Sequence, residues 1–211
     1  MQLGIFLRLI RWKNLGFLIY IHLLLKFIVF SSLKFDTLLT NIQFSLLLLS
    51  VICIMAAGYI INDIFDLNVD LINKPSKLIV SKKISVEKAR FLYKFLNTLG
   101  IGMGVILSLQ IERPGFSLLF IFCSILLYYY SRLFKAKPII GNLLVSLLAA
   151  FGIAILFFAE FKFEILVELP ERLKKIFIFL FGFAFLLNFI REIIKDIIDI
   201  NGDKNLFMNT L

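Results

Sequence analysis

Long apolar runs separated by short charged segments dominate this sequence. They lie at about residues 15–33, 38–62, 94–111, 115–131, 139–159 and 175–193. Most of them have the roughly 17–25 residues that an α-helix needs to cross a bilayer. Residues 1–13, which carry Arg8, Arg11 and Lys13, are typical of an amphipathic segment at the membrane surface. The pattern predicts an all-α fold, a polytopic membrane bundle with six transmembrane helices.

The composition supports a membrane protein and argues against a nucleic-acid partner. Hydrophobic residues make up 61% of the 211 residues, whereas a soluble domain is about 45–50% apolar. The formal charge is +9, but basic and aromatic residues do not alternate as they do on nucleic-acid surfaces. Gly100 and Gly104 have the spacing of a small-residue contact between helices.

The basic residues predict how the chain is oriented in the membrane. Six spans place the N-terminus and the segments 63–93, 132–138 and 191–211 on one side, and most of the lysines and arginines fall there. On the other side, basic residues are fewer and are mixed with acidic ones. The positive-inside rule then places the N-terminus in the cytoplasm. We expect a multi-pass protein of the cell (cytoplasmic) membrane.

Two segments repeat one spacing of aspartates, i, i+3 and i+7, near the ends of the second and the sixth apolar run. The two sets are Asp63, Asp66 and Asp70, and Asp196, Asp199 and Asp203. At about 100° per residue, this spacing keeps three carboxylates on one face of a helix. Either set alone is also compatible with a solvated helix terminus. Two facing sets favour a site in which divalent cations hold a polyanion such as diphosphate.

The motifs around these aspartates resemble those of the UbiA-type intramembrane prenyltransferases. The first reads Asn62-Asp63-x-x-Asp66-x-x-x-Asp70 and is followed by Asn73-Lys74-Pro75. The second, Asp196-x-x-Asp199-x-x-x-Asp203 after Arg191-Glu192-Ile193-Ile194-Lys195, is most similar to the archaeal-lipid branch of the family. Arg11-x-x-Asn14 before the first span and Tyr130-Ser131-x-x-x-Lys135 agree with the same family.

The resemblance implies one domain over residues 1–211 and a transferase activity at the cytoplasmic face. Family members have about nine spans, so we expect this chain to lack the C-terminal helices of the family. The implied reaction moves a polyprenyl group from its diphosphate to a membrane-associated acceptor, with Mg²⁺ as cofactor. The archaeal-lipid branch favours a glycerol-phosphate ether precursor as acceptor, and an aromatic quinone precursor such as 4-hydroxybenzoate is the alternative.

The predicted roles divide the motif residues into three groups. Metal binding is assigned to the first group, Asn62, Asp63, Asp66, Asp70, Asp196, Asp199 and Asp203. Direct participation in the reaction is assigned to Asp66, Asp199 and Tyr130, the last by stabilising a carbocation. Substrate binding, mainly of phosphate oxygens, is assigned to Arg11, Asn14, Lys74, Lys77, Lys135, Arg191 and Lys195.

Two other classes of function are compatible with the same residues. Carboxylates at helix ends also occur in cation transporters, because intramembrane acidic groups mark ion pathways. An inactive truncated homologue would retain the motifs without an intact cavity. Arg191 and Lys195 are also spaced to form ion pairs along their own helix, with Glu192 and Asp199.

Overall fold

The structure, a computed structural model, describes residues 2–35, 37–73, 75–76, 78–135, 137, 139–161 and 170–205, with only the backbone at 73 and 199–205. Within this part of the chain every regular element is helical. In chain order the elements are α1 (Leu3–Leu9), α2 (Trp12–Leu24), the π-helix η1 (Leu25–Phe30), α3 (Asn41–Phe65), α4 (Leu67–Asn73), α5 (Val86–Gln110), the 3₁₀-helix η2 (Pro114–Phe116), α6 (Ser117–Tyr129), the π-helix η3 (Tyr130–Phe134), α7 (Ile140–Glu160) and α8 (Glu171–Asn205).

Side-chain caps fix where two of the long helices begin. The hydroxyl of Thr40 accepts a hydrogen bond from the Gln43 backbone amide, and the Gln43 side chain accepts one from the Thr40 amide. This reciprocal pair satisfies two donors that the first turn of a helix leaves open. The Ser85 side chain caps α5 by accepting from the Lys88 amide.

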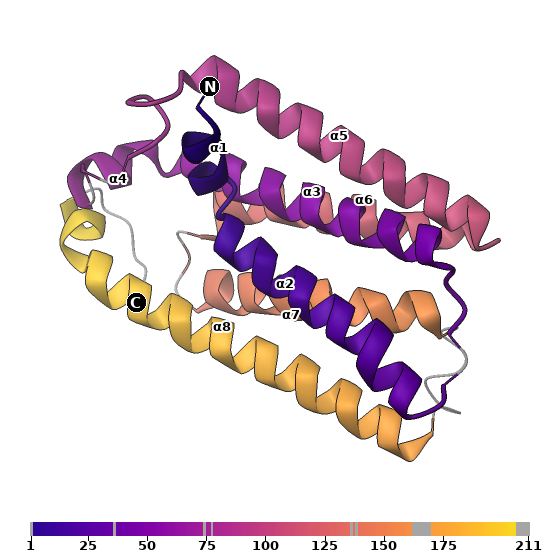
Figure 1. The fold of residues 1–211 in the computed structure, drawn as a ribbon. Coiled ribbons are helices and arrows are strands. Elements are labelled where there is room, and N and C mark those ends of the chain that lie inside the picture. The colour runs from indigo at the N-terminus through magenta and orange to yellow at the C-terminus, as the bar shows by residue number, and fades with distance from the viewer. Residues whose placement is uncertain are drawn as a thin grey trace.

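The long helices run along one another in a bundle (Figure 1). Helix α3 packs along α5, and α7 packs along α8. Gly100 of α5 permits the first contact, since a Cβ atom there would lie 2.8 Å from Ile54 Cγ1 and 3.0 Å from the Ser50 carbonyl oxygen. The Ser50 hydroxyl donates a hydrogen bond to the Gly100 carbonyl across the same contact. The predicted packing role of Gly100 is therefore confirmed.

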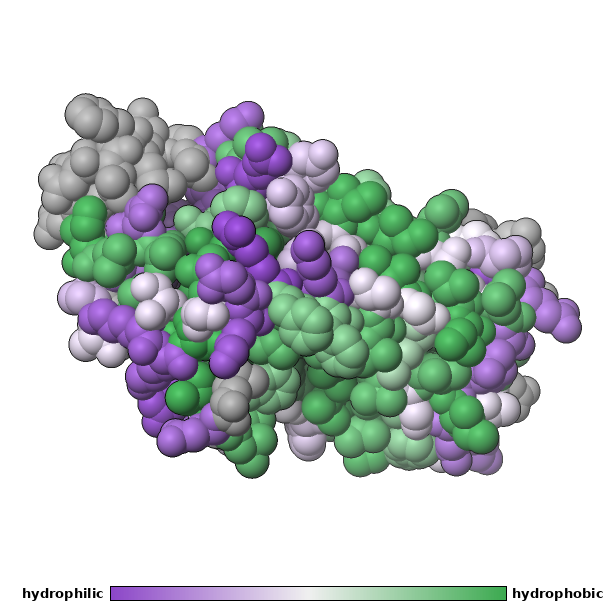
Figure 2. Space-filling view, turned by 90° about the horizontal axis from the view of Figure 1, so that it is seen from above, coloured by the Kyte–Doolittle hydropathy of each residue, from purple (hydrophilic) through white to green (hydrophobic). Residues whose placement is uncertain are grey.

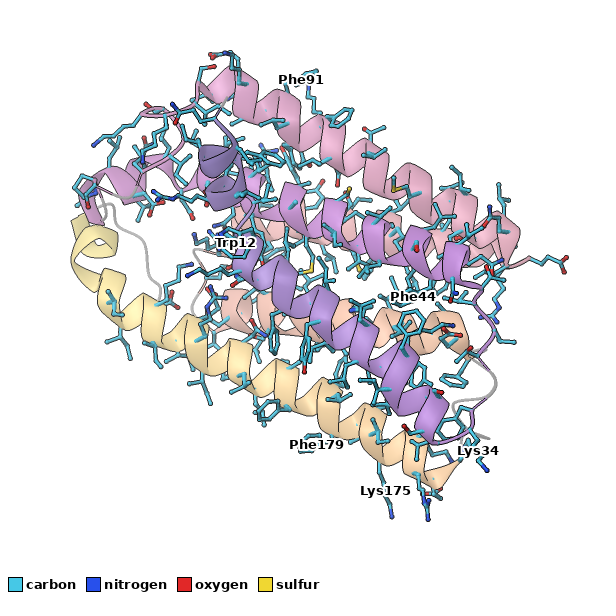
Figure 3. All side chains as sticks on the ribbon, in the orientation of Figure 1. Trp12, Lys34, Phe44, Phe91, Lys175 and Phe179 are labelled. Carbon is cyan, nitrogen blue, oxygen red and sulfur yellow. The ribbon has the colours of Figure 1, made fainter. Side chains whose placement is uncertain are left out.

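Six helical segments are long and apolar enough to cross a membrane, as the hydrophobic pattern predicts. They are Trp12–Phe30, Asn41–Phe65, Val86–Gln110, Pro114–Phe134, Ile140–Glu160 and Glu171–Ile198. The third begins at residue 86 and not at 94, because the polar first turns after the Ser85 cap are helical as well. Apolar side chains cover the middle of the face in Figure 2, and hydrophilic ones gather toward its ends. Phe91 and Phe179 point away from the bundle (Figure 3), as expected of side chains that face lipid.

A buried ion pair closes the end of the bundle opposite α4. The Lys26 ammonium lies 2.6 Å from Glu160 Oε1 and donates to the Leu39 carbonyl at the same distance. The Leu39 amide donates to Glu160 Oε2 at 3.0 Å. Glu160, which the hydrophobic pattern places in a polar loop, is completely buried at the end of α7. The pair thus joins the first span to the fifth, and both of its residues hold the Leu39 backbone between the first two spans.

Candidate functional site

Both aspartate motifs lie at the same end of the bundle. Helix α4 contacts α8, and the two lie together at the left of Figure 1. The second motif lies on the continuous helix α8, as its spacing predicts. The expectation of a single helix is wrong for the first motif, because α3 ends at Phe65 and α4 begins at Leu67. Asp66 therefore lies at the joint of two helices, with Asp63 before it and Asp70 after it.

Arg11 reaches the first motif from the N-terminal segment. Its backbone has a left-handed conformation (φ 53°) between α1 and α2, which costs about 1–2 kcal/mol for a residue other than glycine. This turn brings Arg11 Nη2 to 2.9 Å from Asp63 Oδ1, with the guanidinium 4.8 Å above the Tyr59 ring. Burial lowers the pKa of Arg11, but the attraction of the Asp63 carboxylate outweighs this and leaves the pKa raised. Asn14 lies alongside, with its amide 3.4 Å from the Tyr59 hydroxyl.

Asp66 has an amide and a cation as partners. The Asn62 side-chain nitrogen donates to Asp66 Oδ2 at 2.8 Å, and Lys135 forms an ion pair with the same oxygen. Burial lowers the pKa of Lys135, repulsion by Lys195 lowers it further, and attraction by Asp66 opposes both. Two lysines from distant parts of the sequence therefore act on one site, which favours an anionic ligand.

The turn before α7 contacts both motifs. Lys135 pairs with Asp66 of the first motif, and Asn142 donates to Asp196 Oδ2 of the second at 2.7 Å. Gly141 makes this turn possible, because a Cβ atom there would lie 2.6 Å from the Phe134 carbonyl oxygen. One short segment thus connects the two motifs that the sequence predicts to face each other.

A cavity extends from this end into the bundle. Its inner wall is apolar and includes Val51, Ile54, Met55, Phe120, Phe151 and Ile155. Its polar part combines Arg11, Tyr59, Asn62 and Tyr130 with four residues of α8, namely Asn188, Arg191, Glu192 and Lys195. An apolar cavity with a cationic opening suits a ligand that has a hydrocarbon chain and an anionic head group.

The structure brings together most of the predicted site residues that it describes. Arg11, Asn62, Tyr130, Arg191 and Lys195 line the cavity. Lys74 and Lys77 lie outside the described residues, and so do the side chains of Asp199 and Asp203.

Four residues of the site were not among the predicted ones: Tyr59, Asn142, Asn188 and Glu192. Asn188, Glu192 and Asp196 follow one another at intervals of one turn along α8. Extending the helical spacing of the second motif backward would have found both.

The oxygen-rich donors of the first motif fit a hard divalent cation. The Asn62 side-chain oxygen is buried without a hydrogen-bond partner, next to the Asp66 carboxylate. Carboxylate and amide oxygens are ligands that Mg²⁺ accepts. Among the side chains described, no three of the Asp, Glu, His or Cys type converge as a metal-binding group.

Comparison with known proteins identifies the family. The model of the UbiA prenyltransferase family matches residues 16–211. The chain belongs to the UbiA prenyltransferase family. This agrees with the resemblance of both aspartate motifs and with the all-helical membrane fold.

Two curated relatives of this chain are synthases of the same name. The chain is 35% identical over 163 residues to digeranylgeranylglyceryl phosphate synthase from Methanobrevibacter smithii, covering 77% of this chain and 55% of that protein. The enzyme of the same name from Methanopyrus kandleri is 36% identical over 165 residues, or 77% and 53% of the two chains. The chain spans about half the length of the curated relatives it matches.

A solved structure has the same fold. It comes from a study of digeranylgeranylglyceryl phosphate synthase in membranes and has a TM-score of 0.68 at 28% identity. The similarity covers 99% of this chain and 67% of the other. The bundle that carries the aspartate motifs is therefore an architecture that this relative shares.

Proposed function

We propose that this protein transfers a polyprenyl group, in particular a geranylgeranyl group, from its diphosphate to a glycerol-phosphate ether lipid precursor. The observation that carries the proposal is the cavity, which joins an apolar interior to a cationic opening beside both aspartate motifs. The relatives named digeranylgeranylglyceryl phosphate synthase favour this acceptor over an aromatic one.

The chemistry of each side chain suggests its role in the proposed reaction. The apolar wall around Ile54 and Phe120 would hold the prenyl chain. Lys135, Arg191 and Lys195 would bind phosphate oxygens by charge-assisted hydrogen bonds, with Lys74 and Lys77 as further candidates. Tyr130, which is buried and lines the cavity, would face the carbon that loses the diphosphate and stabilise its positive charge.

Magnesium is part of the proposal. Asn62, Asp63, Asp66 and Asp70 of the first motif, together with Asp196, Asp199 and Asp203 of the second, are the proposed ligands. Bound there, Mg²⁺ would neutralise the charge that develops on the departing diphosphate. Arg11 and Lys135, which pair with Asp63 and Asp66 in this structure, would then turn toward the phosphate groups.

The orientation in the membrane is proposed from the charges. The end with both motifs carries Arg8, Arg11, Lys13 and the basic residues around Lys82 and Lys83. The positive-inside rule favours the cytoplasm for that end. The proposed location is the cell membrane, with the N-terminus and the active site on the cytoplasmic side, where a soluble diphosphate product would be released.

The test is transfer by the purified protein in lipid. Radiolabelled geranylgeranyl diphosphate is supplied with geranylgeranylglyceryl phosphate or 4-hydroxybenzoate in separate reactions, each with and without Mg²⁺. We expect product with the glycerol-phosphate acceptor only in the presence of Mg²⁺, and losses of at least 100-fold in Asp66→Ala and Asp199→Ala. Glu171→Gln, an exposed carboxylate at the other end of α8, is the matched control and should retain activity.

The other outcomes separate the alternatives. Product with 4-hydroxybenzoate alone would assign an aromatic acceptor. Ion flux through vesicles without any prenyl diphosphate, lost in the same aspartate variants, would instead support a cation transporter. A folded protein without transfer or flux would contradict the proposed activity.

A further inference from the structure

The apolar cavity ends at three side chains that come from three different helices. Among the described residues that line it, Val51, Phe120 and Ile155 lie furthest from the aspartate motifs along α3, α6 and α7. All three are buried, and Phe120, with 1% of its surface exposed, is the largest. These three side chains form the floor of the cavity.

One face of α6 and of the first turn after it follows the cavity from the floor to the polar part. Phe120, Cys123, Leu127 and Tyr130 all line the cavity, and their spacing of three or four residues places them on one helix face. The distance from Tyr130 to Phe120 is about 15 Å along the helix axis. A prenyl chain whose reactive end lies at Tyr130 would therefore pass Leu127 and Cys123 before it meets the Phe120 ring.

Gly104 of α5 permits the Phe120 ring to lie where it does. A Cβ atom at Gly104 would lie 2.5 Å from both Cγ and Cδ2 of Phe120 and 3.0 Å from Cδ1, so any larger residue requires the ring to move. None of the described residues that line the cavity comes from α5, which lies at an outer edge of the bundle (Figure 1). The ring therefore lies between Gly104 and the cavity.

The other neighbours of the ring restrict the direction in which it can move. Phe116 packs edge-on against Phe120, with ring centroids 5.4 Å apart and an interplanar angle of 85°. Both rings belong to the buried apolar core, where close packing leaves little free space. The cavity is the open side. A methyl group at position 104 would therefore push the ring into the cavity and make the cavity shallower.

We propose that Phe120 limits the length of the prenyl chain that the cavity accepts, and that Gly104 is the positioning residue that holds its ring back. This inference rests on the proposed function, because it concerns the prenyl diphosphate of that reaction. The floor determines specificity because a chain that is too long must displace the ring, whereas a shorter one leaves part of the apolar wall uncovered. One methylene group in an apolar pocket already changes discrimination by about tenfold or more.

The test compares prenyl diphosphates of three, four and five isoprenoid units with the purified protein in lipid and Mg²⁺. Transfer to geranylgeranylglyceryl phosphate gives kcat/KM for each, and the rise in the midpoint temperature of unfolding on adding each diphosphate reports binding without transfer. We expect the unsubstituted protein to prefer four units. Gly104→Ala should lower kcat/KM for four units relative to three by about tenfold or more. Phe120→Ala should raise kcat/KM for five units relative to four by a similar factor.

Matched variants distinguish positioning of the ring from general damage to the fold. Gly102→Ala on the same helix, where a Cβ atom would meet nothing within 4 Å, should keep the ratios of the unsubstituted protein. Phe122→Ala, which removes an exposed ring of α6, should keep them as well. Gly104→Ala combined with Phe120→Leu should restore the preference for four units, because the smaller side chain makes room for the added methyl group. If Gly104→Ala does not fold, the ratios in Phe120→Ala decide.

The remaining outcomes separate this inference from the proposed function. Equal losses for all three diphosphates in Gly104→Ala, or unchanged ratios in Phe120→Ala, would overturn the role of the floor while transfer by the unsubstituted protein still supports the proposed function. Thermal stabilisation that depends on chain length and shifts in both variants, without any transfer, would support the role of the floor and overturn the proposed function. Neither stabilisation nor transfer with any of the three diphosphates would overturn both.

Discussion

Lys26 and Glu160 are charged residues buried at the end of the bundle away from the aspartates. Lys26 comes from η1 and Glu160 from the end of α7. Each is held by the other and by the Leu39 backbone. A buried pair of this kind contributes little relative to apolar residues, but removing one partner leaves the other charge uncompensated.

Glu160→Gln should therefore destabilise the protein by about 3–5 kcal/mol, because the Lys26 ammonium loses its counter-ion while it remains buried. The measurement is the midpoint temperature of thermal unfolding in detergent. The double variant Lys26→Met with Glu160→Gln should regain part of the loss, since no unpaired charge remains. Equal midpoints for Glu160→Gln and the exposed control Glu171→Gln would contradict this explanation.

At the scale of elements, close helix contact depends on particular glycines. Gly100 and Gly102 are two residues apart on α5, but they face different surroundings. A Cβ atom at Gly100 would meet Ile54 and Ser50 of α3, whereas at Gly102 it would meet nothing within 4 Å. The pair offers a matched test of the contact between α3 and α5.

Gly100→Ala should separate α3 from α5 and reduce stability by about 1–3 kcal/mol, the usual cost of an overpacked interior. The hydrogen bond from Ser50 to the Gly100 carbonyl should weaken in the same variant. Gly102→Ala should leave stability unchanged or raise it slightly, because alanine is the better helix former. Unfolding midpoints of both variants in detergent provide the measurement, and equal losses in the two would refute the packing role.

At the scale of the whole molecule, lysines at the two ends of the bundle make the proposed orientation testable. Lys34 and Lys175 lie toward the end away from α4 (Figure 3), whereas Lys83 lies in the segment that follows α4. The proposed orientation puts Lys83 in the cytoplasm and Lys175 outside. Both side chains are exposed, so both positions are open to chemical labelling.

Single cysteines at these two positions should react on opposite sides of the membrane. With Cys53 and Cys123 replaced by alanine, Lys175→Cys should react with a membrane-impermeant maleimide in intact cells. Lys83→Cys should react only after the membrane is permeabilised. The reverse labelling would invert the topology and place the proposed active site outside the cytoplasm.

The sequence by itself determined the class of fold, the spans and the family. Six apolar runs predict six helices because a bilayer requires a minimum length of apolar helix, and the structure has all six. The repeated aspartate spacing and its neighbours indicated the family because those motifs are long and local. Asp63, Asp66, Tyr130 and Lys135 could be predicted as site residues for the same reason.

Only the tertiary structure decided which side chains meet. The pairing of Arg11 with Asp63 and of Lys26 with Glu160 joins residues far apart in the chain, and helical periodicity carries no information about such contacts. The first motif is broken at Asp66, where α3 ends and α4, which contacts α8, begins. Asn188 and Glu192 follow the helical spacing of the second motif, but only the packed helices show that both line the cavity.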